Sequence, residues 1–146
     1  MKVAFATRDS VHINAHFGSA RMVDVYEVNT EGYSFLETLE FGGNLQEDGN
    51  EDKLAPKVKA LHDCTLVYVS AIGGSAASRL MRHKITPLKA QSEADDEIKN
   101  TLTWLVQTLN GSPPPWLRKA LLQRQPPQLE NQFEDEFETI EEEITV

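Results

Sequence analysis

The chain lacks three features that would point to familiar classes of site. It has one cysteine, Cys64, so it forms no internal disulfide and cannot alone supply the several thiolates of a zinc ribbon or a protein-held iron–sulfur cluster. No stretch approaches the ~20 consecutive apolar residues that a membrane helix needs. The apolar run at the N-terminus is too short for a signal peptide and predicts a strand. We therefore expect a cytoplasmic protein without a membrane partner.

Basic residues are absent from the C-terminal end of the chain. Residues 125–146 contain eight Asp and Glu residues and no Lys or Arg, which leaves 15 acids against 14 basic residues in residues 1–124. The net charge of −9 is thus concentrated in this segment. An acidic segment repels phosphate groups, so we expect no nucleic-acid partner. Its composition predicts disorder.

Apolar patterning in the rest of the chain predicts an α/β fold. Residues 22–28 and 33–41 have the pattern of an N-terminal antiparallel hairpin, and residues 65–69 form a continuous apolar run typical of a central strand. Further elements are expected as strands at 2–7 and 85–88 and as helices at 52–62, 76–82 and 94–109. Together they predict a mixed sheet of about five strands with helices on both faces.

Three segments follow from this pattern. We expect an α/β domain at residues 1–110, then a proline-rich spacer with a short amphipathic helix at 111–124, and an acidic, disordered tail at 125–146. The short helix is expected to dock on the domain or on a partner.

The loop after the first strand, residues 7–21, concentrates groups that bind metals and anions. It contains His12 and His16 together with Arg8 and Arg21. Imidazole suits iron and other transition metals, and guanidinium pairs with anionic ligands. His16 and the nearby Arg8, Ser19 and Arg21 are the candidate ligand contacts. From the residues alone, a polar loop with one structurally satisfied histidine remains the alternative.

A second candidate is the glycine turn at residues 71–77, where Gly73, Gly74 and Ser75 join a strand to a helix. Such a junction directs backbone N–H groups outward at the positive end of the helix dipole, which favours an anion. It also occurs in ordinary tightly packed turns. Because this turn and the 7–21 loop both follow strands, we expect them to meet at the same edge of the sheet.

Other candidate groups carry weaker signals. His62 and Cys64 flank the start of the central strand, where packing roles are the simpler interpretation. Asp9, Asp24 and Asp63 come near strand ends without a recognisable cluster for metal-assisted hydrolysis. No serine or cysteine lies in a nucleophile motif. The sequence therefore gives little support to catalysis.

Three segments together resemble the dinitrogenase iron–molybdenum cofactor biosynthesis family. They read VAFAT at residues 3–7, NAHFGSA at 14–20 and CTLVYVSAIGGSAASRL at 64–80. The resemblance covers about residues 1–110. It implies a ribonuclease-H-like three-layer fold that lacks the hydrolase's carboxylates.

The resemblance also implies a cargo and partners. Family members are similar in binding an iron–sulfur precursor of the iron–molybdenum cofactor, of the kind made by NifB, or the mature cofactor, and in passing it to or from a NifEN-type scaffold. The histidine of the family's His-Phe-Gly element is implicated in holding the cofactor, which carries over to His16 alone. His12 and Cys64 stay open as auxiliary metal ligands without that support.

The leading interpretation is a non-catalytic carrier that holds an anionic cluster transiently. Arg8, Arg21 and Arg79 would supply positive field around the cargo. Two alternatives remain from the sequence. One is a Mg²⁺-dependent phosphohydrolase or nuclease on the ribonuclease-H-like scaffold, and the other is a pure protein-interaction module.

Overall fold

The computed structural model describes residues 1–41, 54–90 and 96–124. The strands are β1 Lys2–Ala6, β2 Met22–Asn29, β3 Gly32–Glu40, β4 Leu66–Val69 and β5 Thr86–Lys89. The helices are α1 Leu54–Ala60, α2 Gly74–Arg82, α3 Ile98–Asn110 and α4 Pro115–Gln123. The predicted acidic tail lies outside the described residues.

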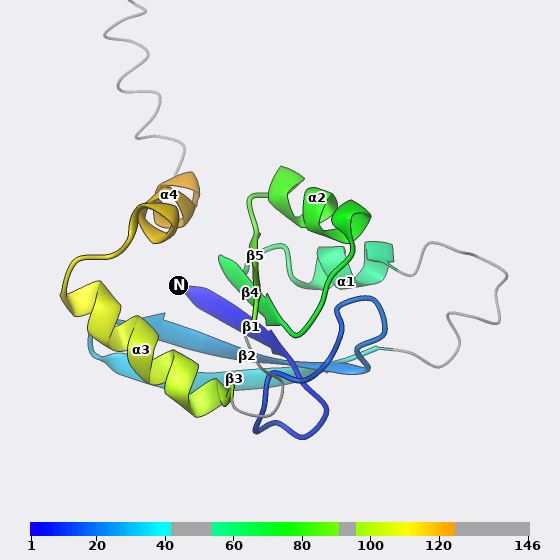
Figure 1. The fold of residues 1–146 in the computed structure, drawn as a ribbon, viewed down its shortest axis with the longest axis horizontal. Coiled ribbons are helices and arrows are strands. Elements are labelled where there is room, and N and C mark those ends of the chain that lie inside the picture. The colour runs from blue at the N-terminus through cyan, green and yellow to red at the C-terminus, as the bar shows by residue number, and fades with distance from the viewer. Residues whose placement is uncertain (42–53, 91–95, 125–146) are drawn as a thin grey trace, which may run out of the picture.

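The strands form one mixed sheet in the order β3-β2-β1-β4-β5 (Figure 1). β1 pairs antiparallel with β2 and parallel with β4, and β4 is parallel to β5. β2 and β3 run antiparallel and are joined at Asn29, whose side-chain oxygen accepts the N–H groups of Glu31 and Gly32 at 2.8 and 3.1 Å. The prediction of a mixed five-stranded α/β sheet is confirmed.

Side chains of the central strand β1 alternate between two apolar cores. Ala4 and Ala6 belong to a core covered by α1 and α2, whereas Val3 and Phe5 belong to a core covered by α3 and α4. All four residues are fully buried. A strand with both faces covered reads as a continuous apolar run, which is why β1 and β4 were visible in the sequence.

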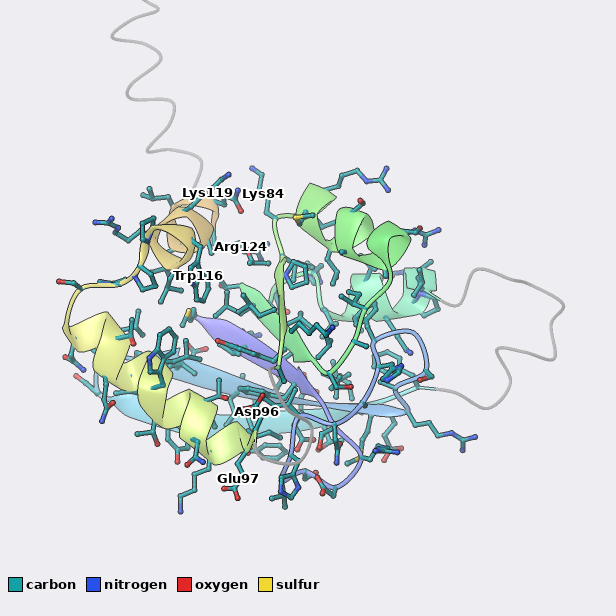
Figure 2. All side chains as sticks on the ribbon, in the orientation of Figure 1. Lys84, Asp96, Glu97, Trp116, Lys119 and Arg124 are labelled. Carbon is teal, nitrogen blue, oxygen red and sulfur yellow. The ribbon has the colours of Figure 1, made fainter. Side chains whose placement is uncertain are left out.

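The last helix, α4, is docked on the body. Leu117 and Ala120 are buried in the same core as α3, and the Trp104 and Trp116 rings stack with centroids 6.4 Å apart. Figure 2 labels Arg124 at the end of α4. Its guanidinium donates hydrogen bonds to the carbonyl oxygens of His62 at 2.8 Å and His83 at 3.2 Å. The helix was predicted to dock either on the domain or on a partner, and the structure shows it packed on the domain.

The predicted start of the third helix at residue 94 is too early for the residues described there. Glu97 has an extended backbone and forms an isolated bridge with His12, and the helix begins at Ile98. The N–H of Ile13 donates to the Asp96 carbonyl at 3.0 Å, and the N–H of Ile98 donates to the Val11 carbonyl at 2.8 Å. This long-range pairing overrides the helical periodicity of the local sequence. Within the described ranges, no helix is long and apolar enough to cross a membrane.

Candidate functional site

The loop between β1 and β2 is joined by its backbone to the end of β4. The Ser70 N–H donates to the Ala15 carbonyl at 3.0 Å, and the Phe17 N–H donates to the Ala71 carbonyl at 2.9 Å. These bonds form a parallel bridge between His16 and Ala71. β1 and β4 are parallel, so the segments that follow them leave the sheet at one edge. The predicted convergence of the two segments is confirmed.

The bridge determines which side of the loop faces outward. Ala15 and Phe17 are buried in the core beneath α1 and α2, while His16 between them is exposed. This is the period-two alternation of extended backbone. Phe17 thus anchors the segment, and the His16 side chain is directed away from the apolar core.

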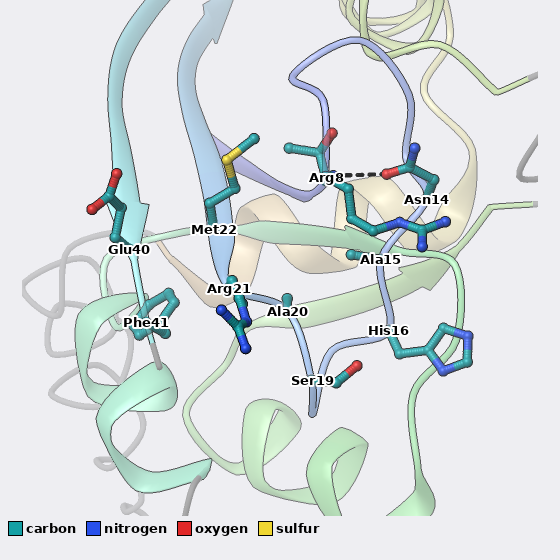
Figure 3. A pocket seen from close by; sticks show the side chains of 11 residues that line it. Arg8, Asn14, Ala15, His16, Ser19, Ala20, Arg21, Met22, Glu40 and Phe41 are labelled. Atoms are coloured by element: carbon teal, nitrogen blue, oxygen red, sulfur yellow. Dashed lines mark hydrogen bonds between the residues drawn. The ribbon is translucent and has the colours of Figure 1, made fainter. Parts of the chain in front are cut away.

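Side chains of the loop and of the neighbouring strands enclose a pocket of about 800 Å³, here called the loop pocket (Figure 3). Its lining comes from the loop, the start of β2 and the end of β3. It comprises Thr7, Arg8, Asn14, Ala15, His16, Ser19, Ala20, Arg21, Met22, Glu40 and Phe41. Four of the predicted contacts, His16, Arg8, Ser19 and Arg21, therefore line one pocket.

The charged groups of the loop pocket favour an anionic guest. The lining contains two guanidinium groups, those of Arg8 and Arg21, and one carboxylate, that of Glu40. The Arg8 backbone N–H donates to the Asn14 side-chain oxygen at 2.8 Å, which fixes one side of the pocket. Guanidinium groups offer several charge-assisted donors to sulfide, carboxylate or oxyanion acceptors. His16 adds an imidazole, a ligand for transition metals.

A buried lysine lies beneath the turn that carries His16 and Ser19. Lys57 of α1 is 3% exposed, and its ammonium donates to the carbonyl oxygens of Phe17 at 2.8 Å and Gly18 at 2.9 Å. The same ammonium lies 5.8 Å from the Phe17 ring centroid and 5.7 Å from that of Phe41. Lys57 thereby connects the turn at residues 17–19 and the Phe41 wall of the pocket to α1.

The glycine turn lies beside the pocket along the chain, outside its lining. α2 begins at Gly74, two residues after Ile72 and three after the bridged Ala71. Gly73, Gly74 and Ser75 are exposed, and a Cβ atom built on either glycine meets no atom within 4 Å. Neither packing nor backbone conformation of the protein itself requires glycine here. The role predicted for these three residues stays a prediction.

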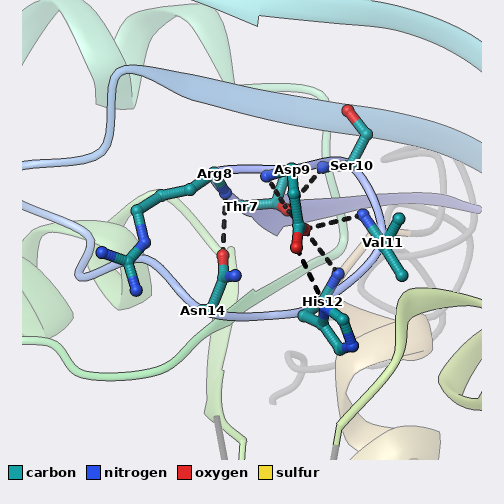
Figure 4. Close-up of polar contacts among 7 residues, drawn as sticks. All are labelled: Thr7, Arg8, Asp9, Ser10, Val11, His12 and Asn14. Atoms are coloured by element: carbon teal, nitrogen blue, oxygen red, sulfur yellow. Dashed lines mark hydrogen bonds and ion pairs between the residues drawn. The ribbon is translucent and has the colours of Figure 1, made fainter. Parts of the chain in front are cut away.

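His12 is directed into its own turn and is not part of the pocket lining (Figure 4). Its Nδ1 lies 2.9 Å from an Asp9 carboxylate oxygen, and the other oxygen accepts the N–H groups of Val11 and His12, each at 2.9 Å. These hydrogen bonds hold the pKa of Asp9 well below its usual range and raise the pKa of His12. The structure therefore does not bring His12 next to His16.

Cys64 is also separated from the pocket. Its side chain is 1% exposed in the core beneath α1 and α2, just before β4, whereas Ala71 follows the other end of that strand. Burial raises the pKa of the Cys64 thiol to about 12, so the thiolate that a metal requires is disfavoured. Arg79, expected to supply field at the cargo, instead lines a second pocket between α1 and α2.

The acids considered for metal-assisted hydrolysis are held apart. Asp9 closes the His12 turn, Asp24 is buried on β2 with the Thr38 hydroxyl donating to it at 2.7 Å, and Asp63 pairs with Lys2 at 2.6 Å. In the described part of the chain, no three His, Cys, Asp or Glu residues gather closely enough to hold a metal ion.

Three residues at or beneath the pocket, Lys57, Phe41 and Asn14, were not predicted from the sequence. A signal for Lys57 was available, because it lies three residues after Leu54 and four before Leu61, on the apolar stripe of α1. A lysine on such a stripe is unusual unless its ammonium is satisfied. Phe41 and Asn14 gave no comparable signal.

Comparison with known families identifies the chain. The family model described as dinitrogenase iron-molybdenum cofactor matches residues 1–104. The chain belongs to this family. The matched residues include all five strands of the sheet and the whole lining of the loop pocket.

Individual relatives agree with this placement, and a solved structure has a similar fold. The chain is 50% identical to protein NifX of Herbaspirillum seropedicae over 83% of this chain and 82% of that protein. It is 36% identical to the FeMo cofactor biosynthesis protein NifB of Bradyrhizobium diazoefficiens over 70% of this chain, which is 20% of that protein. The fold resembles the crystal structure of PH0822 with a TM-score of 0.55 and 19% identity, covering 73% of this chain and 91% of that one. The predicted resemblance to the family is confirmed.

Proposed function

We propose that the chain is a non-catalytic cytoplasmic carrier in nitrogenase cofactor biosynthesis. It binds an iron–sulfur precursor of the iron–molybdenum cofactor in the loop pocket and passes it from NifB-type to NifEN-type proteins. The observation that carries this proposal is one exposed imidazole and two guanidinium groups around a single pocket of about 800 Å³. The similarity to NifX and to part of NifB supports the class of cargo.

Sparse ligation suits a carrier because the cargo must leave again. His16 is the proposed iron ligand, and Arg8, Arg21 and Ser19 would hydrogen-bond to cluster sulfides or to an organic acid on the cluster. Gly73, Gly74 and Ser75 are exposed at the start of α2, and their backbone N–H groups would approach the cargo from the adjoining edge. We assign this binding to a ribonuclease-H-like domain at residues 1–110.

Anaerobic titration with the NifB-derived cluster tests the proposal. The protein should take up the cluster with a visible absorption band, and His16→Ala should weaken uptake about tenfold or more, since one metal–ligand bond is lost. His62→Ala is the matched control, because His62 lies outside the loop pocket and should leave uptake unchanged. Equal affinities of wild type and His16→Ala would refute His16 as the ligand.

Transfer distinguishes a carrier from an enzyme. When the loaded protein is mixed with a NifEN-type scaffold, the cluster should move to the scaffold, and the metal content of the cluster should stay unchanged. A cluster of altered composition after incubation with the carrier alone would instead indicate catalysis.

A further inference from the structure

The α1 and α2 layer carries a second concave surface that the proposed function does not use. It is a groove of about 720 Å³ between the two helices, here called the basic groove. Its lining comprises Ala55, Val58, Lys59, His62, Arg79, Arg82 and His83. Three basic side chains and two histidines thus line the groove together with Ala55 and Val58.

The helices that form the basic groove contain no acidic residue of their own. α1 has the sequence LAPKVKA and α2 has GSAASRLMR. The neighbouring carboxylate of Asp63, next to His62, is held by Lys2 at 2.6 Å. Cations gathered in a concave surface focus a positive potential, so the groove favours an acidic occupant.

The acidic end of the chain starts at the rim of this groove. Arg124, the last described residue, donates to the carbonyl oxygens of His62 and His83, and both of these histidines line the groove. The sequence that follows has eight acids between Glu130 and Glu143 and no Lys or Arg. Six residues of extended chain reach about 20 Å, so Glu130 is within reach of the groove.

We propose that the basic groove is the docking site for the chain's own acidic segment, residues 125–146. The pairing rests on complementary charge and on the anchoring of residue 124 beside the groove, and it does not depend on any cargo in the loop pocket. Tethering makes the contact intramolecular, so weak ion pairs suffice to populate it. An acidic partner protein would then gain access to the groove only by displacing this segment.

A spin label beside the groove in the full-length chain tests the proposal. Ser78 on α2 is exposed and precedes Arg79, and the native Cys64 is 1% exposed, so Ser78→Cys offers one reactive thiol. At low salt the label should enhance NMR relaxation of amides in residues 130–143. Thr103 is exposed on α3 over the other face of the sheet. A label at Thr103→Cys should give an enhancement of the same amides that is smaller by about threefold or more. High salt should abolish the difference, because the Debye length falls to about 3 Å at 1 M.

Charge reversal separates the groove from general attraction. The double variant Lys59→Glu/Arg82→Glu should lower the relaxation enhancement from the Ser78→Cys label about threefold or more. Two charges are reversed together because each ion pair contributes modestly. Lys89→Glu/Lys99→Glu changes the net charge equally at exposed lysines away from the groove, and should leave the enhancement unchanged. Equal enhancement from both labels, or equal loss in both double variants, would overturn the proposal. Failure here would leave cluster uptake by the loop pocket unaffected, so the two proposals fail separately.

Discussion

The loop between β1 and β2 contains two histidines in contrasting settings. In the turn at residues 9–12, the His12 ring and the backbone N–H groups bond to the turn's own Asp9. In the segment at 14–21, the backbone bonds to the end of β4, and the His16 side chain lines the pocket. Each histidine lies in a backbone bridge to a distant segment, His12 with Glu97 and His16 with Ala71. The comparison shows that the side chains differ: the Asp9 carboxylate holds the His12 ring within its turn, whereas the His16 ring lines the pocket.

The largest test of this comparison removes the anchor of the second segment. Phe17 is fully buried, so Phe17→Ala should lower the free energy of unfolding by about 3–5 kcal/mol and disorganise the loop pocket. Val11 in the first turn is 49% exposed, and Val11→Ala should change the free energy of unfolding by less than about 0.5 kcal/mol. Chemical denaturation measures both. Similar losses in the two variants would remove the distinction between the segments.

An intermediate effect is expected at the lysine beneath the turn. Lys57→Met keeps the apolar stem but leaves two carbonyl oxygens without this donor, which should cost about 1–3 kcal/mol of unfolding free energy. Lys59→Met on the same helix removes an exposed ammonium and should cost less than about 0.5 kcal/mol. Denaturation curves and amide exchange at residues 17–19 report the result. An unchanged free energy of unfolding in Lys57→Met would show that the turn does not depend on Lys57.

The smallest expected effect concerns the first turn. Asp9→Asn should return the raised pKa of His12 toward its ordinary value, because the carboxylate hydrogen bond is its largest cause. Because the pKa of Asp9 is lowered, it contributes stability at pH values above the pKa of an unfolded Asp, and this stability is lost as the pH falls through the folded pKa. Because the pKa of His12 is raised, it contributes stability at pH values below the pKa of an unfolded His, and this stability is lost as the pH rises through the folded pKa. The pair therefore stabilises the turn mainly between those two unfolded values. NMR titration of His12 in both proteins measures the change; an unaltered His12 curve would contradict the pairing.

The sequence predicts what short-range pattern controls. Apolar runs at β1 and β4 located the central strands, because both faces of these strands are covered. The meeting of the 7–21 loop with the end of β4 followed from parallel strand direction. His16, Arg8 and Arg21 were found because imidazole and guanidinium groups are uncommon at such density in one loop.

Long-range contacts account for what the sequence did not predict. The start of α3 is displaced by pairing with residues 11–13, and the burial of Lys57 depends on carbonyl groups some 40 positions away in the chain. The positions of His12 and His16 depend likewise on long-range bridges, of His12 with Glu97 and of His16 with Ala71. None of these partners lies within the window that periodicity examines.

The stacked indoles between α3 and α4 provide an optical reporter. Trp104 and Trp116 are the two tryptophans of the chain, so all of its indole emission arises where α4 rests on α3. Release of α4 would separate the rings and change fluorescence and near-ultraviolet dichroism, even with the sheet intact. Events at the C-terminal helix can thus be followed without adding a dye.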